Sequence, residues 1–202
     1  MKIILFLVYF ISLSIFGQMD YSPGFEAGKP MEMSKLEFLI GDWQIDLHYP
    51  GNKSGNPDWK YWTTAKSSNQ SLFNGTYIFE ASNGFPIHGG HEGFNRWEYK
   101  AVFSYDRFQN KYRYIIMDNI LGLLDLYEGN YNADGHLILT NTSTFSNLGD
   151  NRKPQISRMI ISDVDIDKFT IIWQLILKEE YIKNENAEWK WSVKMNYKRK
   201  KK

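Results

Sequence analysis

Alternating apolar and polar positions run through most of this chain and predict β-strands. Between residues 96 and 105, Trp97, Tyr99, Ala101 and Phe103 alternate with charged or polar residues. Because successive side chains of a strand point to opposite faces, such a period of two indicates strands with one buried face. The last segment, 188–200, has the longest alternation, and one face is expected to carry Trp189, Trp191, Val193, Met195, Tyr197 and Arg199.

Short strands joined by turns account for nearly the whole chain after residue 41. The expected strands after the first one span 59–68, 71–82, 96–105, 111–118, 122–131, 136–145, 155–164, 169–178 and 188–200. Turns are expected at 69–70, 106–110 and 132–135, the last of which reads Asn-Ala-Asp-Gly. About ten closely spaced strands with almost no helix predict an all-β fold, an antiparallel up-and-down barrel or a sandwich. A parallel α/β fold is disfavoured, since no long helical pattern separates the strands.

The first strand is preceded by a short helical turn. Ser34 is expected to cap it, with Glu37 completing a capping box, and Gly41 to end it because glycine tolerates the left-handed conformation. Trp43, Ile45 and Leu47 would then open the first strand with their side chains on one face.

This opening motif and the last strand resemble those of calycin barrels, the lipocalins and fatty-acid-binding proteins. In such barrels a Gly-x-Trp opens the first strand, and an Arg near the end of the last strand packs over the Trp. Gly41, Trp43 and Arg199 occupy those positions here, and an Arg–Trp stack contributes about 0.5–2 kcal/mol. The resemblance implies a calycin-like barrel of about ten strands with an internal cavity.

The chain more specifically resembles an uncharacterised family of bacterial calycin-like barrels, known only as a domain of unknown function. The resemblance covers about residues 34–199 and implies no established activity. It depends on Leu36, Leu39, Gly41, Trp43, Gly75-Thr76, Tyr105-Asp106, 112–118, Gly129, Arg158, Tyr197 and Arg199. The Gly- and His-rich segment 83–95 and the basic tail 200–202 depart from the pattern.

Residues 1–17 have the pattern of a secretory signal peptide. Lys2 precedes an apolar run that ends at Phe16, and Gly17 is a small residue suited to cleavage. The run is shorter than the roughly 20 residues of a membrane span, so no stable membrane insertion is expected, although an uncleaved anchor is the alternative. With an extended leader at 18–33 and no cysteine for disulfides, we expect a secreted or periplasmic protein with one barrel domain at 34–199.

Charge and composition exclude one class of partner and favour another. A net charge of +1 gives no drive toward nucleic acid, whereas an aromatic content of 16% suits pleated, half-buried surfaces. We therefore expect a small hydrophobic or amphipathic ligand inside the barrel. The residues expected to contact it are Trp43, Tyr77, Phe79, Phe103, Tyr112, Tyr114, Asp118, Arg158, Trp173 and Trp191. Arg158 would bind a ligand carboxylate or pair with Asp118.

Motifs for catalysis or cofactors are weak. His88 and His91, with Glu92 beside them, offer a metal site, but a Gly-rich loop is a poor scaffold and two exposed histidines are the simpler interpretation. Among the barrels that this chain resembles, the nitrobindin type holds haem through a histidine on a late strand. No histidine follows His136 here, so the resemblance does not imply haem, and no cofactor is predicted.

Two other functions remain open at this point. One is a hydrolase or isomerase that uses Asp118 with His48 or His91, or with Asp125 as a second carboxylate. The other is a filled barrel with a structural role in the cell envelope.

Overall fold

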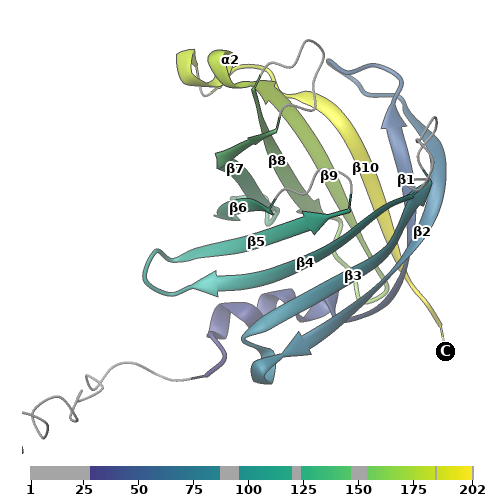
Figure 1. Ribbon diagram of the computed structural model, residues 1–202, viewed down its shortest axis with the longest axis vertical. Coiled ribbons are helices and arrows are strands. Elements are labelled where there is room, and N and C mark those ends of the chain that lie inside the picture. The colour runs from purple at the N-terminus through teal and green to yellow at the C-terminus, as the bar shows by residue number, and fades with distance from the viewer. Residues whose placement is uncertain (1–27, 87–95, 120–123, 147–153, 185, 202) are drawn as a thin grey trace, which may run out of the picture.

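Ten antiparallel strands close into a barrel, as the sequence predicts. The computed structural model describes residues 28–86, 96–119, 124–146, 154–184 and 186–201 (Figure 1). The strands are β1 (Gly41–Pro50), β2 (Trp59–Leu72), β3 (Tyr77–Pro86), β4 (Arg96–Asp106), β5 (Lys111–Asp118), β6 (Leu124–Tyr131), β7 (Leu137–Ser146), β8 (Gln155–Ser162), β9 (Lys168–Leu177) and β10 (Lys190–Arg199). Each strand pairs with its neighbours in sequence, and β1 pairs with β10 to complete the circle.

Among the described residues, three helical segments accompany the strands: η1 (Met31–Leu39), η2 (Phe73–Gly75) and α2 (Lys178–Lys183). η1 lies across one end of the barrel, and α2 lies toward the other end (Figure 1). Met33, Leu36 and Leu39 of η1 are fully buried, so η1 fills this end of the barrel. Among the described residues, no helix has the length and hydrophobicity needed to cross a membrane.

Two local predictions at the ends of elements are wrong. η1 begins at Met31, after Pro30, so Ser34 lies inside it and its hydroxyl donates a hydrogen bond to the Met31 carbonyl at 2.6 Å instead of capping it. β2 continues through 69–70, and the chain turns at Asn74 and Gly75 instead, with φ angles of 55° and 89°. Asn and Gly tolerate positive φ better than other residues, which explains the position of the turn.

The half of the barrel next to η1 is packed solid with aromatic side chains. Trp43, Phe169 and Tyr197 form a cluster in which the ring centres of Phe169 and Tyr197 are 4.2 Å apart. Phe103 and Tyr114 pack beside each other with ring centres 4.6 Å apart, and both are buried. This packing fills the part of the barrel interior that lies next to η1.

A bulge in β10 changes the face that its tryptophans occupy. The pairing of β10 with β9 shifts between Trp191 and Val193, so that Trp191 lies opposite Gln174 and Val193 opposite Trp173. Val193, Met195 and Tyr197 therefore face inward as predicted, but Trp191 faces outward. Its indole nitrogen donates a hydrogen bond to the Gly55 carbonyl at 2.8 Å. The predicted single face from Trp189 to Arg199 is thus wrong at its first two tryptophans, because a bulge inserts one extra residue.

Candidate functional site

A cavity of about 410 Å³ lies in the half of the barrel away from η1. η1 leads directly into the start of β1, whereas the cavity contacts the far end of β1 at Leu47 and Tyr49. The other described lining residues lie toward the same end of the barrel, at the starts of the even-numbered strands and the ends of β5 and β9: Trp62, Trp97, Ile116, Asp118, Asp125, Tyr127, Ser157, Trp173, Leu175, Ser192 and Val193. The cavity is thus the unfilled end of the barrel interior.

Aromatic side chains form a large part of the described cavity wall. Trp173 packs edge-on against Tyr127, with ring centres 5.1 Å apart, and both contact Tyr114 beneath them. Trp62 and Trp97 add two more indoles, and Ile116, Leu175 and Val193 supply aliphatic surface. Such a wall favours an apolar ligand body, because binding removes apolar surface from water.

Two carboxylates stand among these apolar groups. Asp125 of β6 lies directly opposite Ile116 of β5, and Asp118 follows two residues later on the same face of β5. The two acids are therefore diagonal neighbours on adjacent strands, a relation that places Cα atoms roughly 7–8 Å apart. Among the described residues, the Oδ1 atom of Asp125 is buried without a hydrogen-bond partner.

Tyr127 and Ser157 supply the remaining polar contact on this wall. Their hydroxyl oxygens are 2.7 Å apart, so one donates to the other. Burial, with a smaller contribution from the charge of Asp125, raises the pKa of Tyr127 to about 12, although the Ser157 hydrogen bond opposes this. The phenol therefore stays neutral near pH 7 and lies within the negative field of a carboxylate.

The structure brings only part of the predicted ligand-binding set to this cavity. Trp173 and Asp118 line it, and Tyr114 lies just below it. Trp43, Phe103 and Tyr112 face inward but belong to the packed half, where the Tyr112 hydroxyl donates to the Glu32 carbonyl of η1 at 3.1 Å.

Tyr77 and Phe79 lie on the outer face of β3, contrary to the predicted inward orientation. The residues that alternate with them, Ile78, Glu80 and Ser82, are buried. The prediction that the two aromatic side chains of β3 point inward is wrong, because the inward face of this strand carries a carboxylate and a hydroxyl, whereas the outer face carries the two aromatic rings.

Arg158 also faces outward, so it neither pairs with Asp118 nor reaches the cavity. Its Nε donates to the Gln174 side-chain oxygen at 2.6 Å, and its guanidinium lies 4.3 Å from the ring centre of Trp189. Trp191, another predicted ligand contact, also faces outward and does not line the described cavity.

Arg199 lies over Trp43 at the η1 end of the barrel. The guanidinium carbon is 4.3 Å from the indole ring centre, and the two terminal nitrogens donate to the carbonyls of Ile40 and Phe38. Gly41 makes room for it, since a Cβ atom there would lie 2.3 Å from Nη1 of Arg199. This contact joins the first strand, the last strand and η1.

Glu80 is the buried acid that the sequence analysis missed. Its Oε1 accepts hydrogen bonds from the hydroxyls of Tyr197 at 3.0 Å and Tyr99 at 3.1 Å. Burial raises the pKa of Glu80 to about 7, and the two tyrosine hydrogen bonds only partly offset this. Nothing in the local pattern marks this glutamate, because a charged residue in an alternating strand is normally assigned to the solvent side.

The predicted histidine sites do not contribute to the described part of the cavity. His48 lies on the outer side of β1, where its ring packs against Tyr61 with centres 5.7 Å apart. Neither His48 nor His136 is a described lining residue. His88, His91 and Glu92 lie outside the described residues. Within the described ranges, no three His, Asp or Glu residues come together as a metal site.

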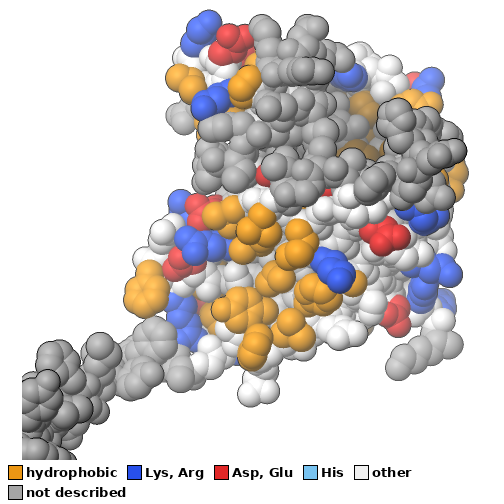
Figure 2. Space-filling model, in the orientation of Figure 1, with side chains coloured by type: hydrophobic (Ala, Val, Ile, Leu, Met, Phe, Trp, Pro, Cys, Tyr) orange, Lys and Arg blue, Asp and Glu red, His pale blue; other side chains and the backbone are white. Residues whose placement is uncertain are grey.

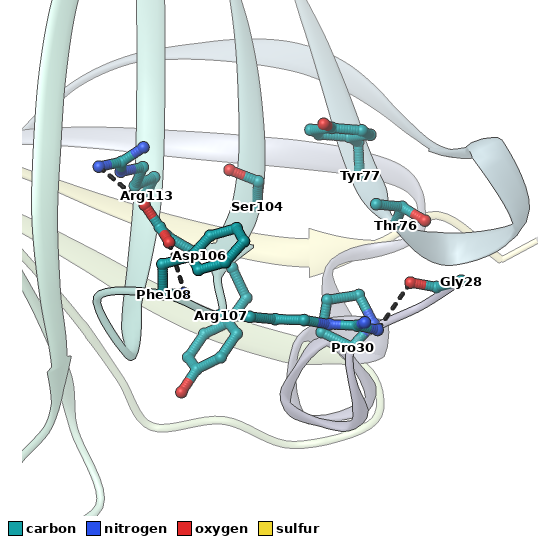
Figure 3. Close-up of a pocket in the computed structure, with 10 residues that line it drawn as sticks. Gly28, Pro30, Thr76, Tyr77, Ser104, Asp106, Arg107, Phe108 and Arg113 are labelled. Carbon is teal, nitrogen blue, oxygen red and sulfur yellow. Dashed lines mark hydrogen bonds and ion pairs between the residues drawn. The ribbon is translucent and has the colours of Figure 1, made fainter. Parts of the chain in front are cut away.

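A second hollow, of about 480 Å³, lies on the outside of the barrel near the start of the described chain. Figure 3 shows Arg107 reaching across to the Gly28 carbonyl, to which it donates at 2.8 Å, and Asp106 turned toward Arg113. The Asp106–Arg113 ion pair measures 2.9 Å. Each of these charged groups already has a protein partner, so this groove offers less for ligand binding than the interior cavity.

Next to this groove, the outer face of β3 to β6 carries an apolar row. Phe79, Val102, Ile115 and Leu126 lie opposite one another across the four strands. Figure 2 shows hydrophobic side chains gathered over β3, β4 and β5, with charged side chains at the margins.

Comparison with known proteins identifies one family. A family model described as "Protein of unknown function (DUF1579)" matches residues 30–199. The match covers more than half of the chain and includes η1, all ten strands, the Arg199 contact and the whole described cavity lining. No curated protein matches the chain.

Proposed function

The chain belongs to the DUF1579 family of proteins of unknown function, and from this premise we propose that it binds a small hydrophobic or amphipathic molecule inside its barrel. The observation that carries the proposal is the cavity of about 410 Å³ with its aromatic wall. Ligand pockets commonly measure about 300–1,000 Å³ and combine apolar walls with a few polar groups. A filled structural barrel would have no such space, so binding is the better explanation.

We favour binding without chemistry because of the polar groups that surround this space. The two serines, Ser157 and Ser192, have no histidine beside them in the described lining, and a serine nucleophile needs an adjacent base. The alternative of an enzyme that pairs Asp118 with His48 loses its support, because His48 lies on the outside of β1.

Export of the protein is part of the proposal. The signal-like residues 1–17 support a secreted or periplasmic, calycin-like carrier that holds its ligand away from water. Determination of the N-terminal residue of the purified protein tests this part, and a start near Gln18 is expected.

Titration with Nile red, a neutral dye that fluoresces in apolar surroundings, tests the binding function. We expect saturable binding to the wild-type protein and a loss of at least about tenfold in affinity in Leu175→Trp, because the larger side chain fills the cavity.

Leu126→Trp is the matched control, since it makes the same change on the outer apolar row and should leave binding intact. Equal binding by the wild-type protein and Leu175→Trp, or loss of binding in Leu126→Trp alone, would contradict an interior site.

A further inference from the structure

The described lining of the cavity carries charge of one sign. Asp118 and Asp125 are the two charged residues in this described lining, which contains no Lys, Arg or His. The arginine expected to bind a ligand carboxylate, Arg158, is held on the outer face by Gln174 and Trp189. Asp118 and Asp125 would therefore repel an anionic head group, and the described lining offers such a group no counter-ion.

The Asp125 carboxylate also lacks a hydrogen bond that burial requires. Its Oδ1 atom is buried with no partner among the described residues. A buried acceptor without a donor costs free energy, so buried polar atoms are normally satisfied by protein, water or ligand. A ligand that donates hydrogen bonds at this position would meet this need, and a charged donor would form the stronger bond.

The aromatic wall suits the same kind of head group. The faces of tryptophan and tyrosine rings attract cations, and Trp62, Trp97, Trp173 and Tyr127 all line the cavity. The Tyr127 hydroxyl is kept neutral and is already engaged with Ser157 at 2.7 Å. The wall therefore supplies apolar contact and cation binding together.

We propose that the ligand is an apolar molecule with a protonated amine, and that Asp118 and Asp125 hold the ammonium group. This inference rests on the proposed binding function and assigns its ligand class. The ammonium group donates to the free oxygen of Asp125, Asp118 completes the negative site from the neighbouring strand, and the hydrocarbon part fills the space between the indoles.

Displacement of Nile red by three ligands with the same alkyl chain tests the proposal. Decylamine is cationic, decanol neutral and decanoate anionic near neutral pH. We expect decylamine to bind at least about tenfold more tightly than decanoate, with decanol between them. Added salt should reduce this preference, since it screens the charges of the site.

Charge-removing variants then locate the origin of the preference. Asp118→Asn with Asp125→Asn should reduce the preference for decylamine over decanoate from at least about tenfold to about onefold. Asp42→Asn makes the same change at an exposed position on the outside of β1 and should keep the preference.

The outcomes separate the two claims. If all three ligands bind equally, or decanoate binds best, the amine assignment is overturned while the binding function stands. If neither Nile red nor decanol binds the wild-type protein, the binding function fails and the assignment fails with it. If Asp42→Asn abolishes the preference as fully as the cavity variants, the assignment to Asp118 and Asp125 is wrong.

Discussion

Replacement of Glu80 by glutamine should flatten the pH dependence of stability. Glu80 lies in the barrel core, 1% exposed, with both tyrosine hydrogen bonds on one oxygen. Glutamine has nearly the same shape, and its side-chain oxygen can accept the same two hydrogen bonds. The substitution therefore removes the titration and keeps most of the packing.

The magnitude follows from the shift in the pKa of Glu80. Burial raises this pKa from 4.5 to about 7 in the folded protein. Between these two values the folded state keeps the proton and the unfolded state has lost it, so the free energy of unfolding falls as the pH rises. At about 1.4 kcal/mol per pH unit, the loss amounts to about 3 kcal/mol and is complete above pH 7.

The assay is urea unfolding, followed by tryptophan fluorescence, at a series of values from about pH 5 to about pH 8. The quantity compared is the change in unfolding free energy across this range, so that constant packing differences cancel. We expect the wild type to lose about 2.5 kcal/mol more than Glu80→Gln, because part of the full loss has already occurred at about pH 5. Glu98→Gln, at an exposed position of the neighbouring strand β4, should behave as the wild type. Parallel pH profiles for the wild type and Glu80→Gln would refute the reasoning.

Three further substitutions test the fold and the assignment of residues to it, each measured by urea unfolding. Gly41→Ala should lower the free energy of unfolding by about 2–4 kcal/mol, because it strains a positive φ and displaces Arg199. The control Gly135→Ala, with positive φ but open space around it, should lower it by only about 1 kcal/mol. Equal losses in the two variants would contradict the role of Arg199. Gly129→Ala should cost about 3 kcal/mol, since its Cβ would lie 1.9 Å from a carbonyl oxygen of β7; an unchanged midpoint would show that the strands separate easily. Arg158→Met should lower the free energy of unfolding by about 1–3 kcal/mol and leave the affinity for Nile red unchanged. Weaker dye binding with unchanged stability would show that Arg158 contributes to the ligand site.

The barrel itself was predictable because its signals are periodic. Alternation over ten segments and the scarcity of helical patterns require strands, and short turns require antiparallel neighbours. Gly41 and Trp43 marked the change from η1 to β1, because a positive φ and a large inward side chain are both encoded locally. The β5 segment, Lys111–Asp118, was predicted with the bounds it has in the structure.

The site was less predictable, because alternation gives the period of a strand but not which face is inward. On β3 the two faces carry similar numbers of apolar residues. The tyrosines that donate hydrogen bonds to the buried carboxyl of Glu80 come from β4 and β10, which are far away in sequence. A single bulge in β10 reversed the face of Trp191 and of Trp189, which lies just before the strand. Asp118 was placed correctly on the inward face, since Tyr112, Tyr114 and Ile116 set the parity of its strand.

The interior location of the ligand is the central claim, and methyl NMR tests it most directly. Leu47, Ile116, Leu175 and Val193 carry methyl groups at the cavity, whereas Val102, Ile115 and Leu126 carry them on the outer apolar row. During a titration with decanol, the account predicts saturable chemical-shift changes in the first group and none in the second. Changes confined to the outer row, or no changes in either group, would contradict it.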